Sequence, residues 1–162
     1  TYFGWLLPWD EPVVLIGDTP EQVSTALRDL SRIGVEHDRV RGVATGPVDE
    51  LAGHRSSSYP HVGWEQLAEA MATDWSDVIL DVRRADEYAE GHLEGAVNVA
   101  IHDLLERLHE IPNGTLWVHC GSGYRASIAA SILDRAGHPV VLVDADWADA
   151  AKAGLPVTTP HD

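Results

Sequence analysis

Residues 116–137 read LWVHCGSGYRASIAASILDRAG, and this stretch decides the fold. It opens with a short apolar run, Leu116–His119, that suits a buried strand, and two glycines shortly afterwards mark a tight loop. Over residues 125–136 apolar residues recur at helical spacing, and Gly137 provides a helix stop. The stretch therefore predicts a strand, a glycine-rich loop and a helix, with Cys120 at the carboxyl end of the strand.

The sequence on both sides of this stretch continues the same alternation of short apolar runs and helical patterns. Further strands are predicted at Val78–Val82, Ala96–Val99 and Val140–Val143. Further helices are predicted at Trp64–Thr73, Ala85–Glu90, Ile101–Ile111 and Trp147–Ala153. Apolar runs without alternation indicate strands that are buried on both faces, and strands interleaved with helices indicate a parallel sheet. We therefore expect an α/β fold, an open parallel sheet with helices on both faces.

The N-terminal part carries a second strand and helix, predicted at Pro12–Ile16 and Pro20–Ile33. Shifting this pair by 103 residues, from 17 to 120, superimposes it on the decisive stretch and places Gly17 on Cys120. We therefore interpret residues 1–52 as a partial, degenerate repeat that lacks the cysteine.

This interpretation fixes the expected domain organisation. Residues 53–61 are rich in serine and contain a proline, as linkers often do, and residues 62–162 form the expected catalytic domain. In the loop of the repeat, Gln22 stands where the decisive stretch has Arg125. We expect this first unit to be catalytically inactive.

Composition excludes several classes of function. The 162 residues carry 26 acidic and 11 basic side chains, a formal net charge of -15, which argues against binding to nucleic acid or to anionic membranes. No apolar run is long enough for a spanning helix. A single cysteine excludes an intrachain disulfide, and we expect a cytoplasmic location.

The chemistry is predicted to lie in the loop Cys120–Arg125. A parallel strand delivers Cys120 to the sheet edge where open α/β sheets bind ligands. The loop amides, the helix N-terminus and the Arg125 guanidinium each favour the reactive thiolate form of a cysteine. We expect Cys120 to be a nucleophile, with Gly121, Ser122, Gly123, Tyr124 and Arg125 binding an anionic substrate.

Several motifs together resemble the rhodanese-like sulfurtransferases over residues 62–157. They are Asp81-Val82-Arg83, Gly91-His92-Leu93-Glu94-Gly95-Ala96, the loop from Cys120 to Arg125, and Gly154-Leu155-Pro156. Asp144-Ala145-Asp146-Trp147 departs from the resemblance, because the family commonly has a pair of glycines there.

The resemblance implies a two-step reaction through a persulfide of Cys120. The donor would be thiosulfate or another small sulfur-containing anion or a persulfide, and the acceptor would be a thiol or cyanide. No cofactor and no metal is implied. Some members follow a metallo-β-lactamase-fold enzyme with a degenerate unit in between, so an upstream metallo-hydrolase domain is an expected partner.

Two other functions compete with this reading. The fold could serve as a non-catalytic docking or regulatory module of a larger sulfur-metabolising enzyme. Cysteine phosphatases and arsenate reductases place five residues between cysteine and arginine, whereas four separate Cys120 from Arg125 here, which disfavours them. The nine histidines show no metal-binding spacing, so we expect no metal site.

The sequence leaves two alternative roles for each of three supporting residues. Asp81 either accepts backbone N–H groups of its loop or is a solvated carboxylate at a strand end. Arg83 either enters the donor pocket or, as we favour, pairs with Glu87 on the following helix. His92 is more readily explained by a structural hydrogen bond than by catalysis.

Within the loop, the sequence also leaves two alternative roles for each of two side chains. Ser122 either donates to the persulfide or simply suits the turn. Tyr124 either lines the mouth of the pocket or packs.

Overall fold

The computed structural model describes residues 11–47, 50, 57–73 and 75–159, which fall into two compact units, residues 1–57 and 58–162. Each unit is described by itself. Trp5 and Trp9 lie outside the described residues, as do residues 53–56 of the predicted linker.

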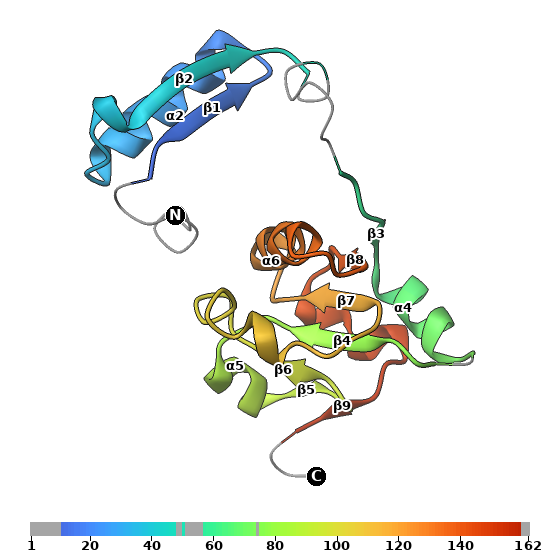
Figure 1. Ribbon diagram of the computed structural model, residues 1–162. Helices are drawn as coiled ribbons and strands as arrows, with labels where there is room; N and C mark the ends of the chain where they lie inside the picture. Colours follow the sequence, from blue (N-terminus) through green and yellow to red (C-terminus); the bar gives the residue numbers. More distant parts are fainter. Residues whose placement is uncertain (1–10, 48–49, 51–56, 74, 160–162) are drawn as a thin grey trace. The chain divides into compact units, whose positions relative to one another are not determined.

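The first unit is a two-stranded parallel sheet with one helix (Figure 1). Strand β1 (Val13–Gly17) pairs in parallel with β2 (Val40–Thr45), and α2 (Pro20–Arg32) connects them. The helix begins where Thr19 accepts a hydrogen bond from the Gln22 N–H (3.3 Å). The predicted strand and helix are thus present, whereas β2 was missed because a glycine and an arginine interrupt its apolar pattern. Whether the unit is a repeat stays a prediction.

The second unit contains a five-stranded parallel sheet in the order β3-β8-β7-β4-β6 (Figure 1). Its strands are β3 (His61–Val62), β4 (Val78–Asp81), β6 (Val97–Asn98), β7 (Leu116–His119) and β8 (Val140–Val143). Its helices are α4 (Trp64–Met71), α5 (Ala85–Glu90) and α6 (Tyr124–Arg135). A short antiparallel pair, β5 (His92–Leu93) and β9 (Val157–Thr158), forms a separate small sheet. The predicted α/β class and parallel sheet are confirmed.

Two hydrophobic clusters cover the two faces of this sheet. On β4, Leu80 belongs to the cluster beneath α6, whereas its neighbour Ile79 belongs to the cluster beneath α4. On β7, Val118 belongs to the cluster beneath α6, and Trp117 packs against the cluster beneath α4. This division explains why the strands read as continuous apolar runs, since side chains on both faces are buried.

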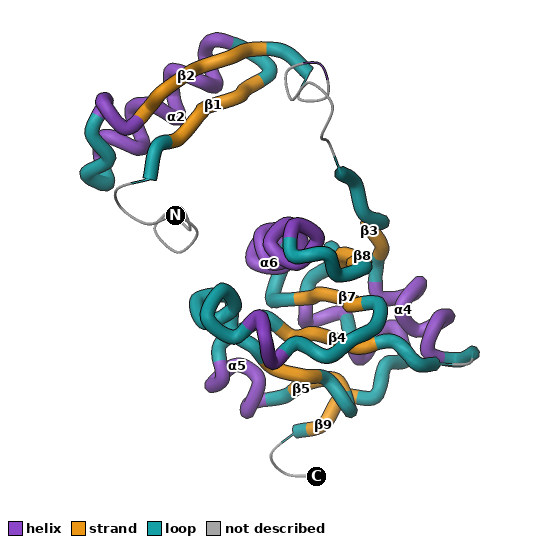
Figure 2. Tube along the Cα trace, in the orientation of Figure 1, coloured by secondary structure: helices purple, strands orange, loops and turns teal. Residues whose placement is uncertain are grey.

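Two predicted helices are wrong. The segment 101–111 consists of hydrogen-bonded turns and one 3₁₀ turn, Leu108–Glu110, and Figure 2 draws most of it as loop. Its buried residues Ile101, Leu104 and Ile111 mimic helical spacing, but several of its hydrogen bonds span three residues, as in the Leu104 N–H to Ile101 carbonyl bond (3.4 Å).

The predicted helix at 147–153 is likewise a pair of 3₁₀ turns, Trp147–Asp149 and Ala151–Ala153. The two-residue strands β3, β5 and β9 were missed because they are too short to show a period.

Candidate active site

The loop that follows β7 lies at the carboxyl edge of the sheet, between β4 and β8. It leads directly into α6, which begins at Tyr124. Gly123 has φ +79°, and a Cβ at this position would collide with the carboxylate of Asp144. Both facts require glycine here, because other residues rarely adopt this φ and none lacks a Cβ. The tight turn therefore brings Asp144 against the loop.

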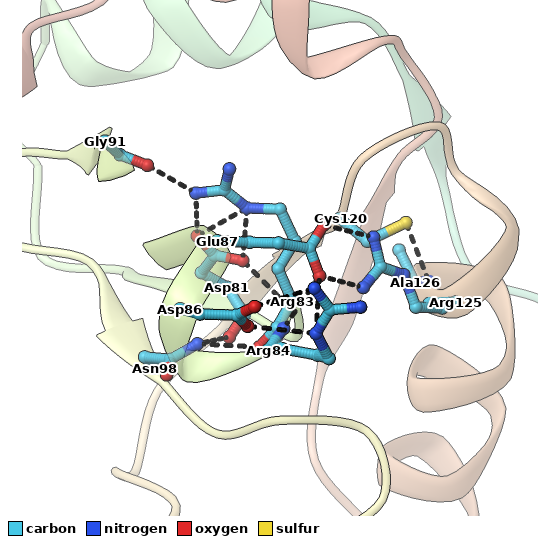
Figure 3. Close-up of polar contacts among 10 residues, drawn as sticks. All are labelled: Asp81, Arg83, Arg84, Asp86, Glu87, Gly91, Asn98, Cys120, Arg125 and Ala126. Atoms are coloured by element: carbon cyan, nitrogen blue, oxygen red, sulfur yellow. Dashed lines mark hydrogen bonds and ion pairs between the residues drawn. The ribbon is translucent and has the colours of Figure 1, made fainter. Parts of the chain in front are cut away.

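Cys120 is more enclosed than the sequence suggested. The residue is 1% exposed, and its sulfur points to the start of α6, where the Ala126 N–H donates to Sγ at 3.4 Å (Figure 3). Its side chain belongs to the hydrophobic cluster beneath α6. The structure thus places one amide, that of Ala126 at the start of α6, on Sγ, whereas the expected role of the loop amides stays a prediction. Cys120 is thus almost fully covered in this structure.

Arg125 lies against the same loop but is held by a carboxylate. Its guanidinium makes two hydrogen bonds with Glu87 of α5, Nη1 to Oε2 (2.6 Å) and Nη2 to Oε1 (2.8 Å) (Figure 3). The Arg125 side chain holds the pKa of the Glu87 carboxyl below its ordinary value. Nη2 would lie 3.0 Å from a Cβ at Gly121, so the guanidinium covers the loop backbone there.

Arg83 pairs with Asp81, and the favoured pairing with Glu87 is wrong. Asp81 accepts hydrogen bonds from the Arg83 backbone N–H (2.9 Å), from Nε (3.0 Å) and from Nη2 (2.6 Å). The two residues are 0% and 3% exposed, so the solvated reading of Asp81 is wrong too. Two residues apart at the end of β4, they meet inside the protein, while Glu87 faces Arg125. Arg83 Nη2 also donates to the Gly91 carbonyl (2.7 Å).

A stack of three planar groups lies beside the loop, and sequence reasoning missed it. The Arg83 guanidinium lies 3.9 Å from the centroid of the Trp147 ring, and that ring stacks on His119 at 5.5 Å and 13°. The backbone N–H of Trp147 donates to the Gly121 carbonyl (2.9 Å), which ties this residue to the one after Cys120. Trp64 meets both Trp147 and His119 edge-on.

His119 is fully buried, and neither ring nitrogen has a hydrogen-bond partner among the described residues. Its Nε2 lies 3.7 Å from Asp81 Oδ2, which is too long for a hydrogen bond. Burial lowers the pKa of His119 to about 4, against an opposing influence of Asp81. The imidazole is therefore neutral at pH 7.

Comparison with protein families identifies this arrangement. A family model described as the rhodanese-like domain matches residues 64–153. The chain belongs to the rhodanese-like domain family.

Individual relatives agree with this assignment. A protein of Allochromatium vinosum named sulfurtransferase is 33% identical over 100 residues, 60% of this chain and 92% of its own length. YrkF of Bacillus subtilis is 30% identical over 94 residues, 57% of this chain and 51% of its own length. The rhodanese-like domain of the Anabaena protein Alr3790 matches with a TM-score of 0.57 at 24% identity, over 63% of this chain and 80% of that one. The chain spans only about half the length of YrkF.

The remaining candidate residues of the rhodanese-like domain are His92, Ser122 and Tyr124. His92 stacks on Tyr88 (3.8 Å, 14°), and its Nδ1 lies 3.0 Å from the Tyr88 carbonyl oxygen, which fits the structural hydrogen bond favoured from sequence. Ser122 forms an antiparallel bridge with Asp146. Tyr124 is 58% exposed, and its two candidate roles stay predictions.

No helix in the described part of the chain is long and apolar enough to cross a membrane. No group of three or more His, Cys, Asp or Glu side chains in those ranges is placed to hold a metal ion.

Proposed function

We propose that the second unit is a sulfurtransferase that carries a sulfane sulfur on Cys120. One observation supports this most: the chain's single cysteine directly follows the central strand β7, receives the Ala126 N–H on its sulfur, and is followed by a loop that leads to the Arg125 guanidinium. An amide N–H and a nearby cation stabilise a sulfur anion in either the thiolate or the persulfide form. Relatives named sulfurtransferase, in A. vinosum, and thiosulfate sulfurtransferase PspE, in Escherichia coli, are consistent with it.

The proposed reaction has two steps and needs no oxidant. In the first, the Cys120 thiolate attacks the outer sulfur of the donor, the donor's S–S bond breaks, and its electron pair leaves with the inner sulfur. In the second, an acceptor nucleophile attacks the outer sulfur of the Cys120 persulfide and regenerates the thiolate. With thiosulfate and cyanide the products are sulfite and thiocyanate, and the charges balance at each step.

The test is thiocyanate formation from cyanide with thiosulfate or a persulfide as donor. Wild type turns over with at least one donor, and Cys120→Ser gives only the background rate. Ser131→Ala, an exposed position on α6 whose hydroxyl donates only to the Ile128 carbonyl, is a matched control that retains the wild-type rate. No turnover by wild type with any donor would refute the proposal.

The enclosure of Cys120 favours a second candidate, a non-catalytic docking or regulatory module. A small alkylating reagent separates the two, because a catalytic thiol must become accessible on the time scale of turnover. Alkylation much slower than turnover would contradict catalysis. The expected upstream metallo-hydrolase domain stays a prediction.

A further inference from the structure

One peptide group in the segment after β8 is hydrogen-bonded on both sides. The Trp64 indole, at the start of α4, donates its Nε1–H to the Asp146 carbonyl (2.7 Å). The N–H of the same peptide group, that of Trp147, donates to the Gly121 carbonyl (2.9 Å). A side chain of α4 is therefore connected, through this peptide group, to the loop that follows Cys120.

Packed side chains hold this peptide group in place. The Trp64 side chain is 2% exposed, and its ring meets that of Trp147 edge-on, with the two centroids 6.1 Å apart. The Trp147 ring also contacts the Arg83 guanidinium (3.9 Å) and stacks on the His119 ring (5.5 Å). The groups that fix the peptide group thus come from outside the loop that follows β7.

The bond to Gly121 sets the direction of the next N–H along the chain. The Gly121–Ser122 peptide bond is trans, so its carbonyl and the Ser122 N–H point in opposite directions. Because the carbonyl is turned toward Trp147, the N–H is turned away from it. Chains of hydrogen bonds polarise one another, so each donation to a carbonyl strengthens the N–H of the same peptide group as a donor. The Trp64 indole therefore both orients and polarises the Ser122 N–H.

The Ser122 N–H lies two residues beyond Cys120, which is the spacing of a turn closed by a side chain. Such a turn forms when an acceptor at the δ position of one residue receives the N–H two residues later, as in Asp and Asn. The thiol of a cysteine ends at the γ position, whereas the outer sulfur of a persulfide occupies the δ position. A persulfide on Cys120 can therefore accept the Ser122 N–H as a carboxylate would.

The neighbouring strand already forms a turn of this kind. Asp81, which ends β4, accepts the Arg83 N–H on Oδ1 at 2.9 Å, two residues further along the chain (Figure 3). Strands β4 and β7 are paired in parallel with Asp81 opposite His119, so Cys120 comes one position later at the same edge of the sheet. The carboxyl edge of this sheet thus accommodates the turn that the persulfide would close.

We propose that Trp64 is a positioning residue for the sulfur that Cys120 carries: through two peptide groups it directs the Ser122 N–H at the outer, negatively charged sulfur of the persulfide. This rests on the proposed sulfurtransferase function. The hydrogen bond forms only in the loaded protein, because the free thiolate has no atom at the δ position. Trp64 therefore stabilises the persulfide relative to the thiolate and shifts the loading equilibrium toward the persulfide.

The experiment measures how sulfur partitions between a donor and the protein. Each protein is equilibrated with thiosulfate and sulfite in a fixed ratio, or with 2-hydroxyethyl persulfide and its thiol. The fraction that carries one extra sulfur is then read from the intact mass. In both exchanges a neutral sulfur atom moves between two anions, so atoms and charges balance without an oxidant. Trp64→Phe keeps an aromatic ring, removes the indole N–H, and should lower the loading equilibrium constant about threefold.

Trp117→Phe is the matched control. The Trp117 indole N–H also makes a part-buried hydrogen bond, to Asp77 Oδ2 (2.9 Å) ahead of β4, so the same substitution removes a comparable bond elsewhere. This variant should retain the wild-type constant. Trp64→3-benzothienylalanine, in which sulfur replaces the N–H in a ring of nearly the same shape, should lower the constant as Trp64→Phe does. It decides the question if Trp64→Phe does not fold.

An unchanged constant in the folded Trp64 variants, or an equal decrease in Trp117→Phe, would overturn the positioning role of Trp64. The proposed function would survive either result, because wild type would still carry the sulfur on Cys120. Failure of wild type to gain a sulfur from either donor would instead refute the proposed function, and the positioning role with it. The two failures are therefore distinguishable.

Discussion

Replacing His119 tests the packing behind the loop that carries Cys120, through the pH dependence of protein stability. Burial lowers the His119 pKa to about 4 from an ordinary value of 6.5, so the unfolded chain binds a proton more readily than the folded one. Above pH 6.5 the imidazole is neutral in both the folded and the unfolded chain, so it does not lower the free energy of unfolding. As the pH falls from 6.5 to 4, the unfolded chain takes up the proton first and the free energy of unfolding decreases. Between pH 7.5 and pH 5 we expect His119 to cost the protein about 2 kcal/mol.

The assay is urea unfolding at these two pH values for wild type and His119→Phe, a variant that keeps a flat ring against Trp147. Other titrating groups act in both proteins, so the difference between their pH effects isolates His119. His102→Phe, at a half-exposed position, is the matched control and should retain the wild-type pH effect. Equal pH effects in wild type and His119→Phe would refute the assignment of a buried, neutral imidazole.

Three further substitutions test the surroundings of the loop. Asp81→Asn leaves a buried guanidinium without its counter-charge and should cost about 3–5 kcal/mol in urea unfolding, and a loss below 1 kcal/mol would contradict the pairing. Gly123→Ala should lower Tm because of its φ and its clash with Asp144, and the added change Asp144→Gly should restore part of the loss; no recovery would mean that the clash is not the cause. Glu87→Gln weakens the hold on Arg125 and should raise kcat/KM for thiosulfate about threefold, whereas a decrease would show that Glu87 positions Arg125 for the donor.

The sheet was predictable from the sequence because each of its longer strands coincides with one short run of apolar residues. Val78–Leu80, Leu116–Val118 and Val140–Val143 are continuous apolar runs, and side chains on both faces of these strands are packed in the hydrophobic clusters. The loop after β7 was predictable for a similar reason, since its glycines, its cysteine and its arginine are neighbours in sequence.

The partners of the charged residues were not predictable in the same way. Arg83 and Glu87 are four residues apart, and local spacing alone favoured pairing them. The structure pairs Glu87 with Arg125, 38 residues away, because α5 and the start of α6 lie side by side at the loop. The stack of Trp147 on His119 joins β7 to a 3₁₀ turn beyond β8, a contact that no local pattern reports.

The departure at Asp144-Ala145-Asp146-Trp147 was visible in the sequence, but its consequence was not. The segment places one carboxylate against Gly123, one backbone bridge on Ser122 and one ring on His119. A pair of glycines would offer neither the charge nor the ring. The residues that depart from the family pattern are therefore in contact with the loop that follows β7 and with His119.

The most direct test of the account is the intact mass of the protein after brief incubation with a sulfane-sulfur donor and removal of the excess. Because Cys120 is the chain's single cysteine, one added sulfur on a thiol can reside nowhere else. The account predicts a species heavier by one sulfur atom, absent from Cys120→Ser and returned to the original mass by cyanide with release of thiocyanate. An unchanged mass with thiosulfate and with a small persulfide donor would contradict it.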